Sequence, residues 1–230
     1  MSRIVSSQGP KTAPKPNLVT AAPSFRLYYF NIKARGEVIR LIFHAVGAKF
    51  DDVRVEDSTG WAKLKTDMPL RTLPTLEFDG MQLGQTMSIA RYLALEFGLR
   101  GQGVYEQALV DSAAETADDL LSDFLEVVFI DRNSKKAEAK RNFVEHILPQ
   151  TLQQLDRYQK QHSSEYGYIV GNGLTFADLA VYNVLDQILT SGMIELGYYQ
   201  RFRYPTELRK RIMTHGGLMR YLNNRPRTKI

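Results

Sequence analysis

Two adjacent tyrosines, Tyr28 and Tyr29, lie in a short apolar segment that is followed closely by a basic residue, Arg35. The segment 25–30 is predicted to be a β-strand, and the apolar periodicity beyond it predicts a helix over about 35–47. A tyrosine hydroxyl at a strand end beside a helix N-terminus could bind a small anion. Because successive strand side chains point to opposite faces, at most one of the two tyrosines could face that ligand. On residue type alone, both could equally be packing aromatics.

Three further pairs of residues carry groups that could hold a ligand. Trp61 and Lys65 lie four apart on a predicted short helix or turn, which places an indole N–H and an ammonium on one side. Leu73-Pro74 indicates a cis-proline turn that exposes backbone groups, although a proline at a strand start would look the same. Gln85-Thr86 follows a hairpin and opens a helix, so it could bind an anion or could simply cap the helix, with Thr86 as the cap.

The chain contains no cysteine, which removes disulfides, thiolate metal sites and a cysteine nucleophile. If the protein carries out sulfur chemistry, the thiol therefore belongs to a ligand. The four histidines lack the spacing of metal ligands, which argues against a metal hydrolase. Runs of eighteen apolar residues are also missing, so no transmembrane helix is predicted.

The elements that must position these residues change character along the chain. Strand, helix, strand and a hairpin at Asp79-Gly80 are predicted first, and helices alone after the break at 98–103. We expect helices over about 104–130 and 135–161, the second kinked by Pro149, and a central buried helix that opens with a capping box at Thr175. One or two short helices are expected around 206–223.

These patterns divide the chain into three parts. Residues 1–24 contain four prolines and no acid, and are predicted to be a disordered extension. Residues 25–98 would form an α/β domain and 104–230 an all-helical domain.

The net charge of +5 is unevenly distributed. Residues 1–24 carry +3 and residues 201–230 carry +8, which leaves −6 for the middle of the chain. Nucleic-acid binding through the basic tail is an alternative function, and it would predict strongly salt-dependent binding. A solvated terminal helix explains the same charges, so we do not expect a nucleic-acid partner.

Taken together, the order of motifs resembles that of the cytosolic glutathione S-transferases. Tyr29-Phe30-Asn31, Ala34-Arg35-Gly36-Glu37, Leu73-Pro74-Thr75, Gln85-Thr86 and Gly171-Asn172-x-x-Thr-x-Ala-Asp occur in the family's order. The details are most similar to the sigma class, which includes haematopoietic prostaglandin D synthase and the S-crystallins. The resemblance implies a thioredoxin-like domain (βαβ-ββα) followed by an all-helical domain, a cytoplasmic homodimer, and glutathione as co-substrate.

The resemblance also implies roles for individual residues. Tyr29, which directly precedes phenylalanine, would be catalytic, and Arg35 would support it. Asp111 would reach the glutathione of the other subunit. Within one subunit, the glutathione-binding residues would be Tyr29, Trp61, Lys65, Leu73, Pro74, Gln85 and Thr86.

A tyrosine hydroxyl that donates to sulfur stabilises thiolate over thiol. A free thiol has a pKa near 8.5, so lowering it by about two units makes the thiolate predominant at neutral pH. The thiolate would then attack electrophilic or peroxidic hydrophobic substrates. One departure concerns this site: the family usually has Gly-Arg-Ala-Glu where this chain has Ala34-Arg35-Gly36-Glu37, so the turn could differ if it needs a positive φ.

The pocket for the second substrate is expected around Phe30, Arg35 and Glu126. Prostaglandin D synthase has a tryptophan where this chain has Glu126, which weakens the alternative of a prostaglandin D isomerase. Glu115, Asp118 and Asp119 suggest a site for Mg²⁺ or Ca²⁺ at the dimer interface, although acids spaced along a helix usually form a solvated face. A non-enzymatic structural or ligand-binding relative is the remaining alternative.

Overall fold

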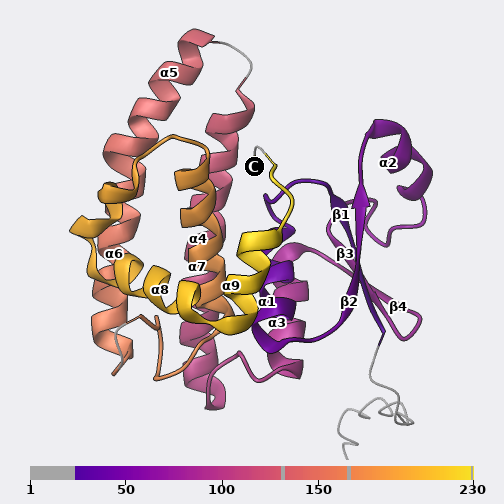
Figure 1. Ribbon diagram of the computed structural model, residues 1–230, viewed down its shortest axis with the longest axis horizontal. Helices are drawn as coiled ribbons and strands as arrows, with labels where there is room; N and C mark the ends of the chain where they lie inside the picture. Colours follow the sequence, from indigo (N-terminus) through magenta and orange to yellow (C-terminus); the bar gives the residue numbers. More distant parts are fainter. Residues whose placement is uncertain (1–23, 131–132, 165–166, 229) are drawn as a thin grey trace, which may run out of the picture.

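The computed structural model describes residues 24–130, 133–164, 167–228 and 230, so nearly all of the predicted extension 1–24 lies outside the described residues. A four-stranded sheet lies on one side of the molecule and a group of helices on the other (Figure 1). The strands are β1 (Phe25–Phe30), β2 (Phe50–Val55), β3 (Thr75–Phe78) and β4 (Met81–Gly84), in the order β2-β1-β3-β4. β2 is parallel to β1, whereas β3 is antiparallel to both β1 and β4.

The register brings four chain segments to one end of the sheet. Phe30 pairs with Val55, Tyr28 pairs with Thr75, and Thr75 pairs with Gly84. The end of β1, the start of β3 and the end of β4 therefore lie at the same end of the sheet, next to the segment that follows β2. The other end of the β3–β4 hairpin turns at Asp79-Gly80, where both residues have positive φ (47° and 76°), as the sequence predicted.

Three helices accompany the sheet: α1 (Glu37–Val46), α2 (Ser58–Leu64) and α3 (Thr86–Glu96). Figure 1 shows α1 and α3 between the sheet and the remaining helices, with α2 at the outer side of the sheet. One face of α1 packs on the sheet, where the ring of Phe43 lies against those of Phe25 and Phe50, and the other face packs against the helical half. The arrangement is the thioredoxin-like βαβ-ββα pattern that the sequence indicated.

The rest of the chain is helical within the described residues. The long α4 (Gly103–Phe129) and the central α7 (Phe176–Thr190) pack along each other. α7 is buried from Phe176 to Ile188 and begins with the predicted capping box, in which the Asp178 carboxylate accepts the backbone N–H of Thr175 at 2.9 Å. The remaining helices are α5 (Asn133–Asn142), α6 (Leu148–His162), α8 (Arg203–Thr214) and α9 (Gly216–Asn224), with a 3-10 turn η2 (Leu196–Arg201).

One helix differs from the prediction. Instead of a single kinked helix over 135–161, α5 leads into a π-helical turn, η1 (Phe143–Ile147), and α6 begins directly after it. Pro149 lies in the first turn of α6. Proline has no N–H and its ring crowds the carbonyl four residues earlier, so the widened turn before it accommodates the chain.

Candidate active site

Tyr29 and Tyr28 occupy opposite faces of β1, as the strand periodicity predicted. The Tyr29 side chain faces the core, and the residue is only 5% exposed. Tyr28 lies on the outer face, where its hydroxyl donates to the carboxylate of Glu77 at 3.3 Å and accepts from the guanidinium of Arg26 at 3.3 Å. Tyr28 is therefore part of a cross-strand polar group, and Tyr29 is the tyrosine that adjoins the strand-to-helix turn.

The hydroxyl of Tyr29 is oriented by the backbone of that turn. Its oxygen accepts the backbone N–H of Arg35 at 3.1 Å. Burial raises the pKa of Tyr29 above its ordinary value, while the N–H groups of Arg35 and Gly36 and the charges of Arg35 and Arg40 offset part of that rise. The phenol therefore remains protonated at neutral pH. Because its oxygen already accepts a hydrogen bond, its proton is available to donate to a ligand.

Aromatic contacts connect this tyrosine with the predicted ligand-binding tryptophan. The ring of Phe30 lies 5.7 Å from that of Tyr29 and 6.0 Å from that of Trp61, measured between centroids and in edge-on geometry. Trp61 is half-buried in α2. Lys65 follows one turn later, and its backbone N–H donates to the backbone carbonyl of Trp61 at 2.9 Å. The peptide bond of Leu73-Pro74 is cis, as predicted, and it directly precedes β3 at the same end of the sheet.

At the start of α3, the structure corrects one prediction. Thr86 does not cap the helix: the N-cap position is Gln85, which has φ 73° and makes no capping bond with its side chain. The Thr86 hydroxyl is buried, and no partner for it is found in the described part of the chain. A buried hydroxyl beside the free N–H groups of a helix N-terminus fits a carboxylate ligand. Glutathione carries two carboxylates, so this unpartnered hydroxyl is a group that suits it as a ligand.

The side chain of Arg35 crosses to the helical half. Its guanidinium donates to the carboxylate of Asp118 at 3.1 Å and to the hydroxyl of Ser122 at 2.9 Å, both on α4. Burial raises the pKa of the Asp118 carboxyl, and the charge of Arg35 opposes that rise. Further along α4, Glu126 is exposed. Burial raises the pKa of the neighbouring Asp123, and the charges of Asp119 and Glu126 add to that rise. The predicted pocket wall is therefore acidic on this side.

The predicted metal ligands do not form a cluster. Asp118 is paired with Arg35, while Glu115 is paired with Arg91. Among the residues that the structure describes, no three acidic or histidine side chains form a group that could hold a metal ion. The cause is the competition of two arginines for carboxylates that the sequence alone presents as free. Asp111, expected to serve the other subunit, is paired with Arg91 and Arg100 of its own chain, each at 3.1 Å.

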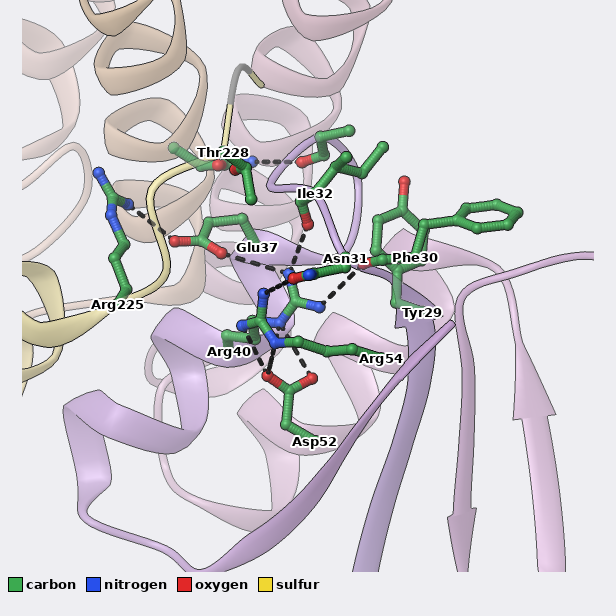
Figure 2. A network of polar contacts seen from close by, with 12 residues as sticks. Tyr29, Phe30, Asn31, Ile32, Glu37, Arg40, Asp52, Arg54, Arg225 and Thr228 are labelled. Carbon is green, nitrogen blue, oxygen red and sulfur yellow. Dashed lines mark hydrogen bonds and ion pairs between the residues drawn. The ribbon is translucent and has the colours of Figure 1, made fainter. Parts of the chain in front are cut away.

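Sequence reasoning missed Arg40, a fully buried arginine within the apolar run of α1. Its guanidinium lies 5.7 Å from the centre of the Tyr29 ring and donates to the carbonyls of Phe30 at 3.3 Å and Ile32 at 2.7 Å. Both oxygens of Asp52 accept from its Nε at 3.1 Å, and Figure 2 shows the guanidinium at the centre of this network. A lone arginine between apolar residues was the signal that could have revealed it.

A second omission lies in α7. The side-chain amides of Gln187 and Asn183 donate to the carbonyl of Ala34 at 3.1 Å and 3.4 Å. Ala34 itself has φ 33°, so the turn does need a positive φ, and an alanine adopts it. The signal was two amides four residues apart in a helix whose other residues are mostly apolar.

Part of the basic C-terminal segment is neutralised inside the molecule. Arg225 is paired with two buried carboxylates, that of Glu37 at 2.7 Å and that of Asp186 (Figure 2 shows the Glu37 pair). Beyond it, the carbonyl of Ile230 accepts the N–H of Lys33 at 2.6 Å, which brings this segment to the turn that precedes Arg35. The tail charge that suggested nucleic acid therefore contributes to the fold at this residue.

Comparison with known proteins agrees with this fold. The model of the glutathione S-transferase N-terminal domain matches residues 24–95, and that of the C-terminal domain matches residues 118–225. The chain belongs to the glutathione S-transferase family, whose members use glutathione as co-substrate. No described helix has both the length and the apolar character needed to cross a membrane.

Individual relatives extend over nearly the whole chain. S-crystallin 3 of Enteroctopus dofleini is 33% identical over 221 residues, which cover 90% of this chain and 99% of the relative. Hematopoietic prostaglandin D synthase of Gallus gallus is 33% identical over 211 residues, which cover 90% and 100%. The structure of a monomeric glutathione S-transferase from the hookworm Necator americanus has a TM-score of 0.80 at 28% identity, covering 90% of this chain and 100% of the hookworm chain.

Proposed function

We propose that this protein is a sigma-class-like glutathione transferase in which the Tyr29 hydroxyl stabilises the glutathione thiolate for attack on hydrophobic electrophiles. The observation that supports this most is the orientation of Tyr29. Its oxygen accepts the Arg35 N–H at 3.1 Å, and burial raises the pKa of its phenol, so a proton is held at the hydroxyl at neutral pH. A hydrogen bond from that hydroxyl to sulfur, with the proton staying on the phenol, stabilises the thiolate relative to the thiol.

The other groups at this end of the sheet would hold the two ends of glutathione. Thr86 and the first N–H groups of α3 suit the γ-glutamyl carboxylate, and Trp61 and Lys65 suit the glycyl carboxylate. The backbone of Leu73 would pair with the peptide between them. The thiolate then forms the new bond to carbon or oxygen of the second substrate as the leaving group departs, with Arg35 beside the reacting centre.

The proposal is tested with a conjugation assay using glutathione and chlorodinitrobenzene. Tyr29→Phe removes only the hydroxyl, so we expect kcat/KM to fall about 10- to 100-fold, the value of a hydrogen bond to a charged group. Tyr28→Phe is the matched control and should change the rate by less than about two-fold, because a mutation outside the site has little effect. A folded Tyr29→Phe variant with the activity of the wild type would refute the mechanism.

Two other functions are less consistent with the geometry. A prostaglandin D isomerase would need an apolar wall near the reacting centre, whereas Glu126 is exposed there and Asp123 lies near it on α4. Product analysis with a prostaglandin endoperoxide distinguishes this candidate. A non-enzymatic relative would not require the hydroxyl geometry of Tyr29, and it predicts no glutathione consumption in the conjugation assay.

The assembly and location are part of the same proposal. We expect a cytoplasmic homodimer in which Asp111 reaches the γ-glutamyl ammonium of the partner's glutathione. Asp111 would then have to be shared with Arg91 and Arg100, with which it is already paired. Sedimentation of the purified protein, with and without glutathione, tests the dimer.

A further inference from the structure

The first residue of α1, Glu37, has a buried carboxylate that three donors share. One of its oxygens accepts from the guanidinium of Arg225 at 2.7 Å. The other accepts from the hydroxyl of Tyr221 at 3.0 Å and from the guanidinium of Arg40 at 3.4 Å. Figure 2 shows the carboxylate between the two arginines. Its charge is therefore balanced from two sides, by α1 itself and by the residue that follows α9.

Arg225 connects the start of α1 with the end of α7. Its guanidinium also pairs with the carboxylate of Asp186, and both side chains are largely buried. Asp186 directly precedes Gln187, whose amide donates to the carbonyl of Ala34 at 3.1 Å. Arg225 thereby contacts the residue that follows the turn between β1 and α1, and also the part of α7 that holds the middle of that turn. A planar guanidinium suits this place because it can donate to two carboxylates at once.

The chain that continues from α9 also reaches the start of this turn. The backbone N–H of Lys33 donates to the carbonyl of Ile230 at 2.6 Å. The ammonium of Lys33 donates to the hydroxyl of Thr190, in the last turn of α7, at 2.6 Å. The turn is therefore held on both sides of Arg35, whose N–H donates to the Tyr29 hydroxyl at 3.1 Å.

A second connection runs through Arg40 to the ring of Tyr29. The guanidinium of Arg40 lies 5.7 Å from the centre of that ring and donates to the carbonyl of Ile32 at 2.7 Å. Without Arg225, Arg40 would be the one arginine of the described residues that is still paired with Glu37. Because the attraction of the carboxylate would no longer be balanced from the other side, Arg40 should move toward Glu37 and away from the ring.

We infer that Arg225 is a positioning residue for the Tyr29 hydroxyl. Its two ion pairs hold the turn so that the Arg35 N–H meets that hydroxyl and leaves the phenol proton for the sulfur. This inference rests on the proposed function, because it assigns Arg225 a role in the ionisation of glutathione. The groups proposed to hold the carboxylates of glutathione lie on α2 and α3, whereas Arg225 pairs with α1 and α7. Its effect should therefore appear in the ionisation of the thiol and not in the binding of glutathione.

The test compares Arg225→Gln with the wild type. In the complex with glutathione, titration of the ultraviolet absorbance of the thiolate should give a thiol pKa about one unit higher, because a misplaced hydroxyl stabilises the thiolate less. With chlorodinitrobenzene at saturating glutathione and about pH 6, the rate should fall about 10-fold, since the thiolate fraction falls by that factor below the pKa. The dissociation constant of glutathione at about pH 5, where the thiol is protonated in both proteins, should change by less than about two-fold.

Two single variants and one double variant separate positioning from a general effect of charge or damage. Arg227→Gln makes the same change at an exposed arginine two residues further on and should be silent. Arg225→Lys keeps the charge but cannot donate to both carboxylates with a planar fork, so its thiol pKa should lie between those of Arg225→Gln and the wild type. In the Tyr29→Phe background the hydroxyl is absent, and adding Arg225→Gln should cause almost no further loss of activity.

Three results would overturn the inference. One is a thiol pKa in folded Arg225→Gln equal to that of the wild type. Another is a loss of activity explained only by weaker binding of glutathione at about pH 5. The third is simple addition of the losses in the double variant with Tyr29→Phe.

Folding is checked by circular dichroism and thermal melting, and all rates are measured well below the lower melting temperature. Arg225→Gln leaves two buried carboxylates with less compensation, so it should lower the melting temperature. If it does not fold, Asp186→Asn/Arg225→Gln replaces it, because this pair removes one charge of each sign and leaves Glu37 paired with Arg40. If neither variant folds, Arg225 serves the fold alone and the inference is wrong. Failure of the proposed function is recognised separately, by a wild type without conjugation activity or an unaffected Tyr29→Phe variant.

Discussion

The guanidinium of Arg35 donates to the carboxylate of Asp118 across the boundary between the two halves of the molecule, at 3.1 Å. Arg35 follows the strand that carries Tyr29, and Asp118 lies in the middle of α4. This ion pair is partly buried, because 37% of the arginine side chain and 22% of the aspartate side chain are exposed. In the proposed function, a substrate that enters beside Tyr29 would meet a cation that is oriented by the Asp118 carboxylate and the Ser122 hydroxyl of the helical half.

Asp118→Asn should weaken that orientation. We expect kcat/KM to fall several-fold at neutral pH, because a charged hydrogen bond is replaced by a neutral one. Burial raises the pKa of the Asp118 carboxyl, so in the wild type acidification removes its charge and activity should decline on the acid side. The variant should lack the part of that decline that comes from Asp118, while the part that comes from protonation of the glutathione thiolate remains. The pH profile of kcat/KM measures it, with Asp119→Asn as control, and identical acid limbs in wild type and Asp118→Asn would contradict the prediction.

Thr86→Val replaces the unpartnered hydroxyl with a methyl group of the same shape. If the hydroxyl binds a glutathione carboxylate, the KM for glutathione should rise about 10- to 100-fold with little change in kcat. Thr86→Ser keeps the hydroxyl and should stay close to the wild type. Initial rates at varied glutathione concentration test both variants. An unchanged KM in Thr86→Val would mean that the carboxylate binds elsewhere.

Arg40→Lys keeps the charge but loses the planar fork that reaches Asp52 and the carbonyls of Phe30 and Ile32 together. Because the group is fully buried, we expect a loss of about 3 kcal/mol in the free energy of unfolding. Urea denaturation followed by circular dichroism measures it. Arg220→Lys, at an exposed position of α9, is the control and should change stability by less than about 0.5 kcal/mol.

The stability of the protein should depend on pH through the carboxyl group of Asp178. Burial raises the pKa of its carboxyl from 3.8 to about 6, although the N–H groups of Thr175 and Ile169 and the hydroxyls of Thr175 and Tyr204 oppose that rise. The folded state then holds the proton more tightly than the unfolded state. The contribution of Asp178 to stability is therefore complete below about pH 4 and is lost as the pH rises through 6.

The measurement is urea unfolding of wild type and Asp178→Asn between pH 4 and 7. Position 178 of the variant cannot titrate. The free energy of unfolding of the variant should therefore fall below that of the wild type by the largest amount at pH 4 and by a smaller amount at pH 7. Two curves that run parallel across this range would show that Asp178 does not titrate there. Thr175→Ser, which preserves the capping box, serves as the control for the fold.

Local signals carried much of the fold. The alternation of β1 separated Tyr28 from Tyr29, the Asp79-Gly80 pair gave the hairpin, and the apolar run of α7 marked it as central. Each of these depends on neighbours within a few residues, which a sequence displays directly. The family resemblance then indicated which of the two tyrosines to examine.

Features that depend on distant partners could not be predicted in the same way. Thr86 looked like a helix cap because its type suits that position, but Gln85 takes the cap and leaves the hydroxyl unpaired. Glu115 and Asp118 looked free because the arginines that bind them come from α3 and from the turn after β1. No local pattern links Gln187 to Ala34, which lie 153 positions apart.

The bond between Gln187 and Ala34 has a consequence for engineering. The sequence can be divided near residues 98–103, yet the turn beside Tyr29 in the first part is held by amides of the second. A chimera that joins this sheet to the helices of another family member would inherit whatever side chains that member has at positions 183 and 187. Grafting the two amides together with the sheet should therefore decide whether such a hybrid ionises glutathione, independently of which electrophile its new helices accept.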